Sequence, residues 1–269
     1  MSLKRIILLS QFELTRLFAT KRGWLALAAF TMVWLIILRY PIYHAVSVLR
    51  SPEFSDIAIQ VAGSIGLYQL VRWPEAELSV YWIIALFTFP LFTLFVSADQ
   101  TVEDAKRGTL RFLTLRASRA ELLLGRFTGQ VLVLLALITV SVLAAWLLML
   151  TRDTALLFSG LLKLVVIITL LALTTLPFIA LMALLNLLAN SARLSIIYAT
   201  LLFTVGNLLI GYLASHIEAA QWLYYALPGV HISRIAPWYD INLLSIATPV
   251  LQSVALLSVA YWLIKRKDL

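Results

Sequence analysis

Six long stretches without a charged residue decide what this sequence can fold into. They cover residues 23–38, 78–98, 127–151, 164–192, 194–217 and 241–264. A helix of about 20 apolar residues crosses the hydrocarbon core of a bilayer. The whole chain is 62% hydrophobic and 13% charged, whereas soluble domains have about half and a quarter. We therefore predict an all-α integral membrane protein, one transmembrane domain over 1–269, with helices near 23–39, 78–98, 127–151, 164–190, 194–215 and 243–264.

Residues 1–22 precede the first stretch and have a helical periodicity of their own. One face of that helix is apolar, and the basic residues lie largely off it; the apolar face comprises Leu3, Ile6, Ile7, Leu14, Leu17 and Phe18. This pattern predicts an amphipathic helix in the membrane interface. The alternative is the frayed start of the first membrane span.

The basic residues are distributed unevenly between the two sides that six spans define. Of the 21 Lys and Arg residues, 15 fall on the termini and on the connections of the same side. Basic residues concentrate on the cytoplasmic side of membrane proteins. We therefore expect cytoplasmic N- and C-termini in a bacterial-type inner membrane, and we interpret the net charge of +8 as a topology signal and not as a nucleic-acid-binding patch.

Two connections on the other side are longer than turns. Residues 40–77 have mixed polarity, and this segment is a candidate for docking an extracytoplasmic partner. Residues 216–240 are rich in Trp and Tyr and are interrupted by Pro228, Gly229 and Pro237. Aromatic residues of this density are typical of the headgroup level of the membrane. We expect a broken outer segment before the last span.

The connection at 99–126 is the most charged part of the chain, with ten charged residues out of 28. Gly108 is a candidate helix end, and Ser118 with Glu121 has the spacing of a capping box that begins the next helix. Between them, four apolar residues alternate with arginines: Leu110, Phe112, Leu113 and Leu115 with Arg111 and Arg116. A small apolar patch edged by arginines is suited to docking in a partner's groove. The alternative is a loop that lies on anionic lipid.

The order of residues in this connection resembles the type-2 (ABC-2) permease family of ABC transporters, and the resemblance extends over the whole chain. The residues that carry it are Glu103, Gly108, Thr109, Leu110, Leu113, Ser118, Arg119, Glu121, Leu122 and Arg126. Two positions depart mildly, since the family often has Lys at Arg126 and Pro at Ala117. The resemblance implies a coupling helix that inserts into a separate ATP-binding subunit, a second permease subunit (an identical copy or a paralogue), and export.

The resemblance also implies roles for individual residues. The ATPase-docking residues would be Gly108, Thr109, Leu110, Arg111, Phe112, Leu113, Leu115 and Arg116. Glu103, Ser118 and Glu121 would support the loop. We expect ATP and Mg²⁺ on the partner subunit, because the chain has no Gly-Lys dipeptide and hence no Walker A motif of its own. We expect no cofactor, metal or catalytic residue in this chain, which lacks cysteine and has three scattered histidines.

The membrane-core portions of the six stretches contain no ionisable residue. This weighs against an ion-coupled carrier or channel, and against a membrane enzyme or scaffold, which stay as alternatives. Uncharged walls favour a hydrophobic or amphipathic substrate, unless the motion itself is passed to an extracytoplasmic partner. Asn207 is a candidate pathway residue, although such residues more often bond between helices. Gly125 and Gly129 form a GxxxG motif, which we interpret as a site of packing within the chain.

Overall fold

The computed structural model describes residues 3–44, 47, 73–99, 117–189, 191–238 and 241–266, and every regular element in these ranges is helical. Six helices within these ranges are long and apolar enough to cross a membrane. The prediction of an all-α integral membrane protein with six spans is therefore confirmed. Two of the helices, Arg119–Arg152 and Leu157–Leu188, are longer than the uncharged stretches 127–151 and 164–192, because charged and polar residues extend their ends.

The first helix, α1 (Leu3–Ala19), is separated by a tight bend from α2 (Lys21–Ile37). Thr20 caps α2, accepting a hydrogen bond from the Gly23 amide at 3.1 Å. The π-helix η1 (Leu38–Ile42) extends this first span. Most of the segment 40–77 lies outside the described residues, and with it the proposed docking role.

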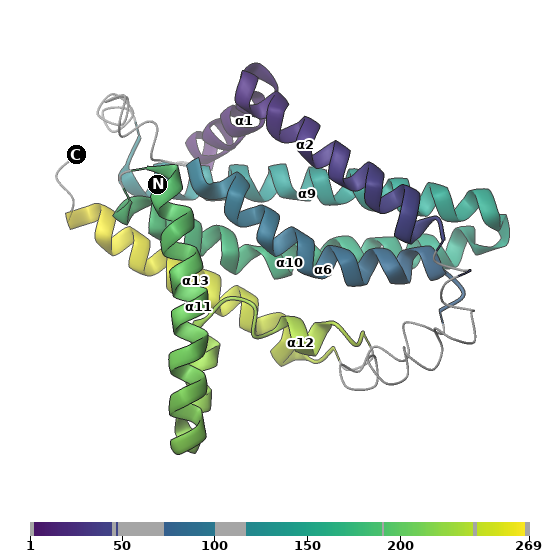
Figure 1. Cartoon of the computed structure of the whole chain (residues 1–269). Coiled ribbons are helices and arrows are strands. Elements are labelled where there is room, and N and C mark those ends of the chain that lie inside the picture. The colour runs from purple at the N-terminus through teal and green to yellow at the C-terminus, as the bar shows by residue number, and fades with distance from the viewer. Residues whose placement is uncertain are drawn as a thin grey trace.

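Three long helices run alongside one another and form the centre of the fold (Figure 1). They are α6 (Ala76–Val96), α9 (Arg119–Arg152) and α10 (Leu157–Leu188), with the 3-10 turns η2 (Ser97–Asp99) after α6 and η3 (Thr154–Leu156) before α10. Their core contains the large, fully buried side chains of Tyr81, Trp82 and Phe89. The Tyr81 hydroxyl and Ser141 Oγ are 2.8 Å apart, which joins α6 to α9.

The last helix, α13 (Leu243–Arg266), packs along α10, whereas α11 (Ala192–His216) runs crosswise to the three central helices (Figure 1). Between α11 and α13 the chain forms η4 (Glu218–Ala226), which lies against α11, and α12 (Ile232–Ile235). This is the broken segment that the Pro and Gly residues predicted.

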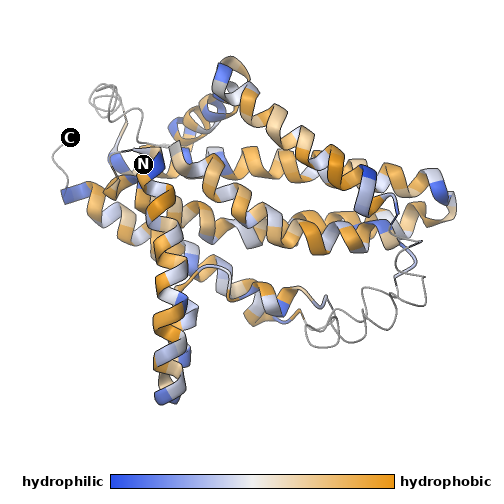
Figure 2. Cartoon of the chain, viewed as in Figure 1, coloured by the Kyte–Doolittle hydropathy of each residue, from blue (hydrophilic) through white to orange (hydrophobic). Residues whose placement is uncertain are grey.

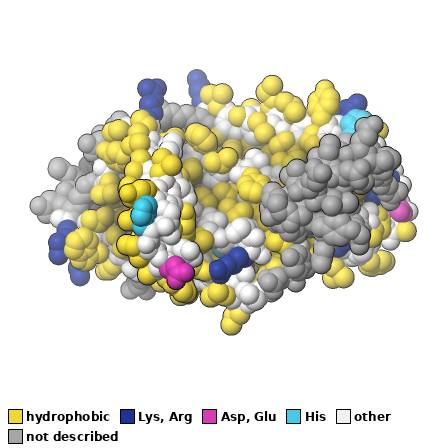
Figure 3. Space-filling model, turned by 60° about the horizontal axis from the view of Figure 1, so that its bottom comes forward, with side chains coloured by type: hydrophobic (Ala, Val, Ile, Leu, Met, Phe, Trp, Pro, Cys, Tyr) yellow, Lys and Arg dark blue, Asp and Glu magenta, His cyan; other side chains and the backbone are white. Residues whose placement is uncertain are grey.

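Hydrophobic residues cover the helices on nearly all sides, and hydrophilic residues gather at their ends (Figure 2). The space-filling view shows the same distribution, with large hydrophobic areas and few, scattered charged side chains (Figure 3). Such a surface is typical of a protein whose solvent is lipid.

Candidate functional site

The first turn of α9 forms the predicted capping box, directly after the charged connection. Ser118 Oγ accepts a hydrogen bond from the Glu121 amide at 3.2 Å, and Glu121 Oε2 accepts one from the Ser118 amide at 2.9 Å. The Glu121 side chain is buried, and Arg5 of α1 lies 3.5 Å from its carboxylate. Glu121, in the first turn of α9, is thus also in contact with α1.

Arg119, beside the capping box, joins α9 to the end of the chain. Its Nη1 donates hydrogen bonds to the carbonyl oxygens of Ile264 at 2.8 Å and Lys265 at 2.9 Å. These carbonyls belong to the last turn of α13, where the helix leaves its acceptors unpaired. A guanidinium there satisfies the acceptors and interacts favourably with the negative end of the helix dipole.

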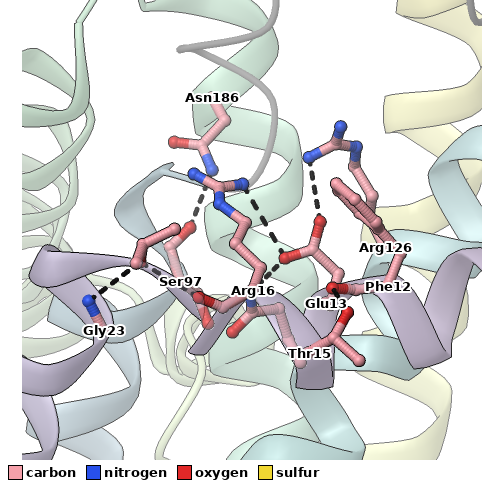
Figure 4. A network of polar contacts seen from close by, with 10 residues as sticks. Phe12, Glu13, Thr15, Arg16, Gly23, Ser97, Arg126 and Asn186 are labelled. Atoms are coloured by element: carbon pink, nitrogen blue, oxygen red, sulfur yellow. Dashed lines mark hydrogen bonds and ion pairs between the residues drawn. The ribbon is translucent and has the colours of Figure 1, made fainter. Parts of the chain in front are cut away.

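A buried ion pair joins α1 to α9 two turns further on (Figure 4). Arg126 Nη1 donates to Glu13 Oε1 at 3.1 Å, and both side chains are 4% exposed. Gln130 donates to the second carboxylate oxygen at 3.4 Å, and Arg16 lies 3.8 Å from it. Buried charges are costly unless they are paired and hydrogen-bonded, so this group fixes α1 on α9 in one register.

The two glycines of the GxxxG motif form the surface on which α1 lies. A Cβ atom at Gly125 would come within 2.6 Å of Leu9 Cβ, and one at Gly129 within 2.7 Å of Glu13 Cβ. Ser10 also approaches closely, with its Oγ 3.1 Å from the Gly125 carbonyl oxygen and 2.5 Å from Thr128 Oγ1. The motif therefore serves packing within the chain.

The face of α1 that packs on α9 carries two buried polar residues. Ser10 and Glu13 are buried against α9, while Leu3, Leu8 and Phe12 are exposed. Of the predicted apolar face, Leu14 and Leu17 pack on the core, whereas Leu3, Ile7 and Phe18 remain exposed. The exposed apolar residues remain available to the membrane interface, so the interfacial position of this helix stays a prediction.

We call the contacts of α9 over Arg119–Gln130 with α1 and α13 the α9 junction. The other end of the charged connection is also fixed, because Asn186 of α10 donates from Nδ2 to the Ser97 carbonyl oxygen at 2.8 Å (Figure 4). Ser97 begins η2, the last described element before residue 100. Each flank of the connection is therefore held by a buried polar contact.

The docking residues predicted from the sequence lie outside the described residues, which resume at Ala117. This holds for Gly108, Thr109, Leu110, Arg111, Phe112, Leu113, Leu115 and Arg116, and for Glu103. Ser118 and Glu121 are described and form the capping box. Asn207 is exposed on α11, and its Nδ2 donates to the Phe203 carbonyl oxygen of its own helix at 2.7 Å.

The opposite end of the central helices carries a second set of ion pairs. Arg152 donates from Nε to Glu77 Oε1 at 2.6 Å and from Nη2 to Oε2 at 2.9 Å. Lys163 pairs with the buried Glu75 and also lies over the Trp73 ring, 4.1 Å from its centroid. Burial raises the pKa of Glu75, but hydrogen bonds from Lys163 and Ser159 outweigh it, so that this pKa lies below its ordinary value.

Three tryptophan rings pack together at this same end of the central helices. The Trp238 ring meets those of Trp73 and Trp82 edge to face, each with centroids 4.9 Å apart. Trp238 has a φ of 68°, a left-handed conformation that is costly for a bulky residue. Trp82 also donates from Nε1 to the Ala236 carbonyl oxygen at 3.1 Å. These contacts hold the chain between α12 and α13 against the central helices.

A buried polar group lies where this segment meets α10 and α13. Gln252 donates from Nε2 to the carbonyl oxygens of Tyr225 at 2.7 Å and Leu227 at 3.1 Å. His231 is 1% exposed, beside Thr174 and Gln252, and among the described residues neither ring nitrogen has a partner that satisfies normal hydrogen-bond geometry. Burial lowers the pKa of His231 to about 4, with Thr174 and Gln252 opposing the shift.

Sequence reasoning missed the ion pairs that define both ends: it used Arg126 only as part of the family pattern and assigned no partner to Glu13, Glu77 or Arg152. One signal was present: Glu13 is the only acidic residue in the otherwise basic N-terminal 22 residues. A lone acid on a basic amphipathic helix indicates a specific basic partner. Nothing in the sequence identified that partner as Arg126, 113 residues away.

Comparison with known families adds to this geometry. The chain matches the family model described as ABC-2 family transporter protein over residues 10–252, from the middle of α1 into α13. A search of curated proteins gave no match. With six membrane-spanning helices and a family match over most of its length, the chain belongs to the ABC-2 transporter family and is an ABC permease subunit.

Proposed function

We propose that this chain is the membrane subunit of an ATP-driven exporter and receives its energy from a separate ATP-binding subunit at residues 108–116. ATP and Mg²⁺ would bind to that subunit, and this chain would hydrolyse nothing itself. Both termini and residues 99–126 would face the cytoplasm across a bacterial-type inner membrane, as the distribution of Lys and Arg indicates.

The observation that carries this proposal is the way both flanks of residues 100–116 are held. Before the segment, the Asn186 amide bonds to the Ser97 carbonyl. After it, α9 begins with the capping box, and the first turn of α9 contacts both α1 and α13. A loop that only rested on lipid would not require buried polar contacts at both ends.

The α9 junction supports a mechanical role for the segment. A push on residues 108–116 would act on the start of α9, where Arg119 is bonded to α13 and Arg126 to α1. Because the Glu13–Arg126 pair is buried, α1 cannot slide along α9 without exposing a charge to an apolar environment. Movement of the partner would therefore displace α1, α9 and α13 together.

We infer the substrate class from the absence of charged residues in the spans. The uncharged stretches favour a hydrophobic or amphipathic cargo, and Asn207 is the polar residue that we propose for its pathway. Export is the direction that the family implies. If no cargo moves, the same displacement would act on an extracytoplasmic partner through residues 40–77.

The docking segment is tested by the double substitution Leu110→Glu with Leu113→Glu. We expect the variant to insert into the membrane but to lose the ATP-binding subunit in a mild-detergent pull-down, because two carboxylates would replace the apolar contact. The matched control, Gln100→Glu with Thr101→Glu, adds the same charge to the same connection outside 108–116 and should keep the partner. Normal co-purification of the double Leu variant would contradict the docking assignment.

The energy source is tested by the unmodified chain purified from its native cells. A nucleotide-binding protein in about equal amount is the expected partner. Transport by the purified chain without nucleotide would instead support the ion-coupled carrier. Recovery of the chain without any nucleotide-binding protein would leave the membrane enzyme or scaffold as the better interpretation.

A further inference from the structure

The broken segment between α11 and α13 brings an ionisable side chain to the middle of the helical core. His231, the residue before α12, lies beside Thr174 of α10 and Gln252 of α13. Thr174 is about 20–25 Å from either end of α10. The contact is close, since a Cβ atom at Gly229 would lie 3.4 Å from the Phe178 ring of α10. An ionisable side chain at such a depth in a membrane protein is a candidate functional site.

The side-chain amide of Gln252 has a fixed orientation. Its Nε2 donates to two backbone carbonyl oxygens, those of Tyr225 at 2.7 Å and Leu227 at 3.1 Å. An amide nitrogen carries two hydrogens, so both donors are used and the oxygen lies on the other branch of the amide. This oxygen, Gln252 Oε1, is buried and has no hydrogen-bond partner within the described part of the chain. It is therefore an acceptor that still lacks a donor.

The imidazole of His231 adds two further polar atoms to the same place. Among the described residues, neither ring nitrogen makes a hydrogen bond of normal geometry, although the Thr174 backbone and the Gln252 side chain are its polar neighbours. Buried polar atoms in native proteins almost always have a partner. Polar groups that lie close together without a direct bond are often bridged by a third group. The contact between α10, α12 and α13 therefore has the polar atoms for one bridging group.

The surroundings of this site define the charge of the group that it accepts. The helices α10 and α13, which pack on His231, carry charged residues only towards their ends, at Lys163, Lys265 and Arg266. Arg234, on α12 itself, is exposed. The described residues also contain no group of His, Cys, Asp and Glu suited to a metal ion. A buried ion without a counter-charge is costly, so the bridging group must be uncharged.

We propose that His231, Gln252 and the backbone of Thr174 bind one uncharged O–H group between α10, α12 and α13. This group belongs to an internal water molecule or to an amphipathic cargo with a hydroxyl. Either one can donate to the amide oxygen and accept from an imidazole N–H. The cargo source rests on the export function proposed above, whereas the water source does not depend on it. In both cases the bound group joins the broken outer segment to the two helices that it covers.

Nitrogen NMR of the full chain, isotopically labelled on histidine and placed in lipid bilayers, tests the site. The chain has three histidines, so the signals of His231 are those lost in His231→Phe and kept in the matched control His216→Phe. In the unmodified chain we expect at least one ring nitrogen of His231 to contact the proton of an O–H group that is not part of the protein. Ring nitrogens without hydrogen bonds, or bonded only to protein groups, would overturn the proposal.

Octanol and octane, added separately to the bilayers, distinguish the two sources. If the site takes a cargo hydroxyl, the carbon-bound protons next to the octanol hydroxyl should contact the His231 ring, and those of octane should not. If the site holds an internal water molecule alone, octanol should leave the O–H contact unchanged. Equal contact from octanol and octane would show that the site accepts apolar molecules without regard to the hydroxyl, which would contradict the proposal.

A variant of the amide tests the role of Gln252. Gln252→Met keeps the length of the side chain and removes its polar atoms, so we expect the O–H contact at His231 to be lost. The matched control is Gln221→Met, at an exposed position of η4, which should keep the contact. Persistence of the contact in Gln252→Met would contradict the assignment of the amide. A Gln252→Met chain that does not fold leaves the measurement on the unmodified chain as the deciding one.

These outcomes are independent of the test of the docking segment. If the ATP-binding subunit co-purifies but His231 contacts no O–H group, the permease assignment stands and the proposed site is wrong. If His231 contacts an O–H group but no ATP-binding subunit is found, the site stands and the proposed energy source is wrong.

Discussion

The consecutive helices α10 and α11 are both uncharged over most of their length, yet they lie in opposite surroundings. Of the 32 residues of α10, 17 are buried, against 3 of 25 in α11. Thr174, Thr175 and Asn186 of α10 are buried inside the chain, whereas Thr200, Thr204 and Asn207 of α11 are exposed. The comparison separates polar side chains that make contacts within the chain, such as that of Asn186, from polar side chains that lie exposed on its surface.

The comparison implies that buried polar residues stabilise the single chain and that exposed ones do not. The largest effect is expected at the Glu13–Arg126 pair. Glu13→Ala leaves Arg126 buried without its carboxylate and should lower the free energy of unfolding by about 3–5 kcal/mol. Thermal unfolding in detergent measures this, with the exposed Glu218→Ala as control. The double variant Glu13→Leu with Arg126→Leu should recover much of the loss, and a double variant as unstable as Glu13→Ala would show that charge burial is not the cause.

The second effect is a dependence of the free energy of unfolding on pH, caused by His231. This residue lies between α10, α13 and the segment before α12. Its pKa is about 4 in the folded chain and about 6.5 when unfolded. Above pH 6.5 the side chain is neutral in both states. As the pH falls from 6.5 to 4, only the unfolded chain binds the proton, so that stability decreases, by up to about 3 kcal/mol.

Comparison of unfolding at pH 7.5 and pH 5 tests this effect. His231→Gln should unfold with a smaller difference between the two pH values than the unmodified chain. Ser233→Ala, at an exposed position of the same segment, should keep the original difference. A pH dependence that is unchanged in His231→Gln would rule out His231 as its origin.

The smallest effect compares the same substitution in the two helices directly. Asn186→Leu removes the hydrogen bond to Ser97 and leaves a buried carbonyl unpaired, which should cost about 1–3 kcal/mol. Asn207→Leu, at an exposed position of α11, should change stability by less than about 0.5 kcal/mol. Equal losses at the two positions would contradict the distinction between α10 and α11.

The sequence was sufficient for the spans, the broken segment before α13 and the capping box at Ser118. Each of these depends on residues that are close together in the chain: an apolar length, a cluster of Pro and Gly, or a pair three residues apart. The family resemblance likewise depended on local order within 99–126. Such short-range patterns can be predicted from the sequence, because helix geometry fixes which nearby residues lie on the same face.

Only the tertiary structure decided that Ser10 and Glu13 of α1 face α9, that Gly125 and Gly129 form the surface beneath them, and that Arg119 caps α13. It also decided that Asn186 is buried while Asn207 is exposed. These facts join residues about 90 to 150 positions apart. In a chain whose lipid-facing and protein-facing sides are equally apolar, hydrophobic pattern carries no information on which face packs inward, because burial in protein and burial in lipid satisfy it alike.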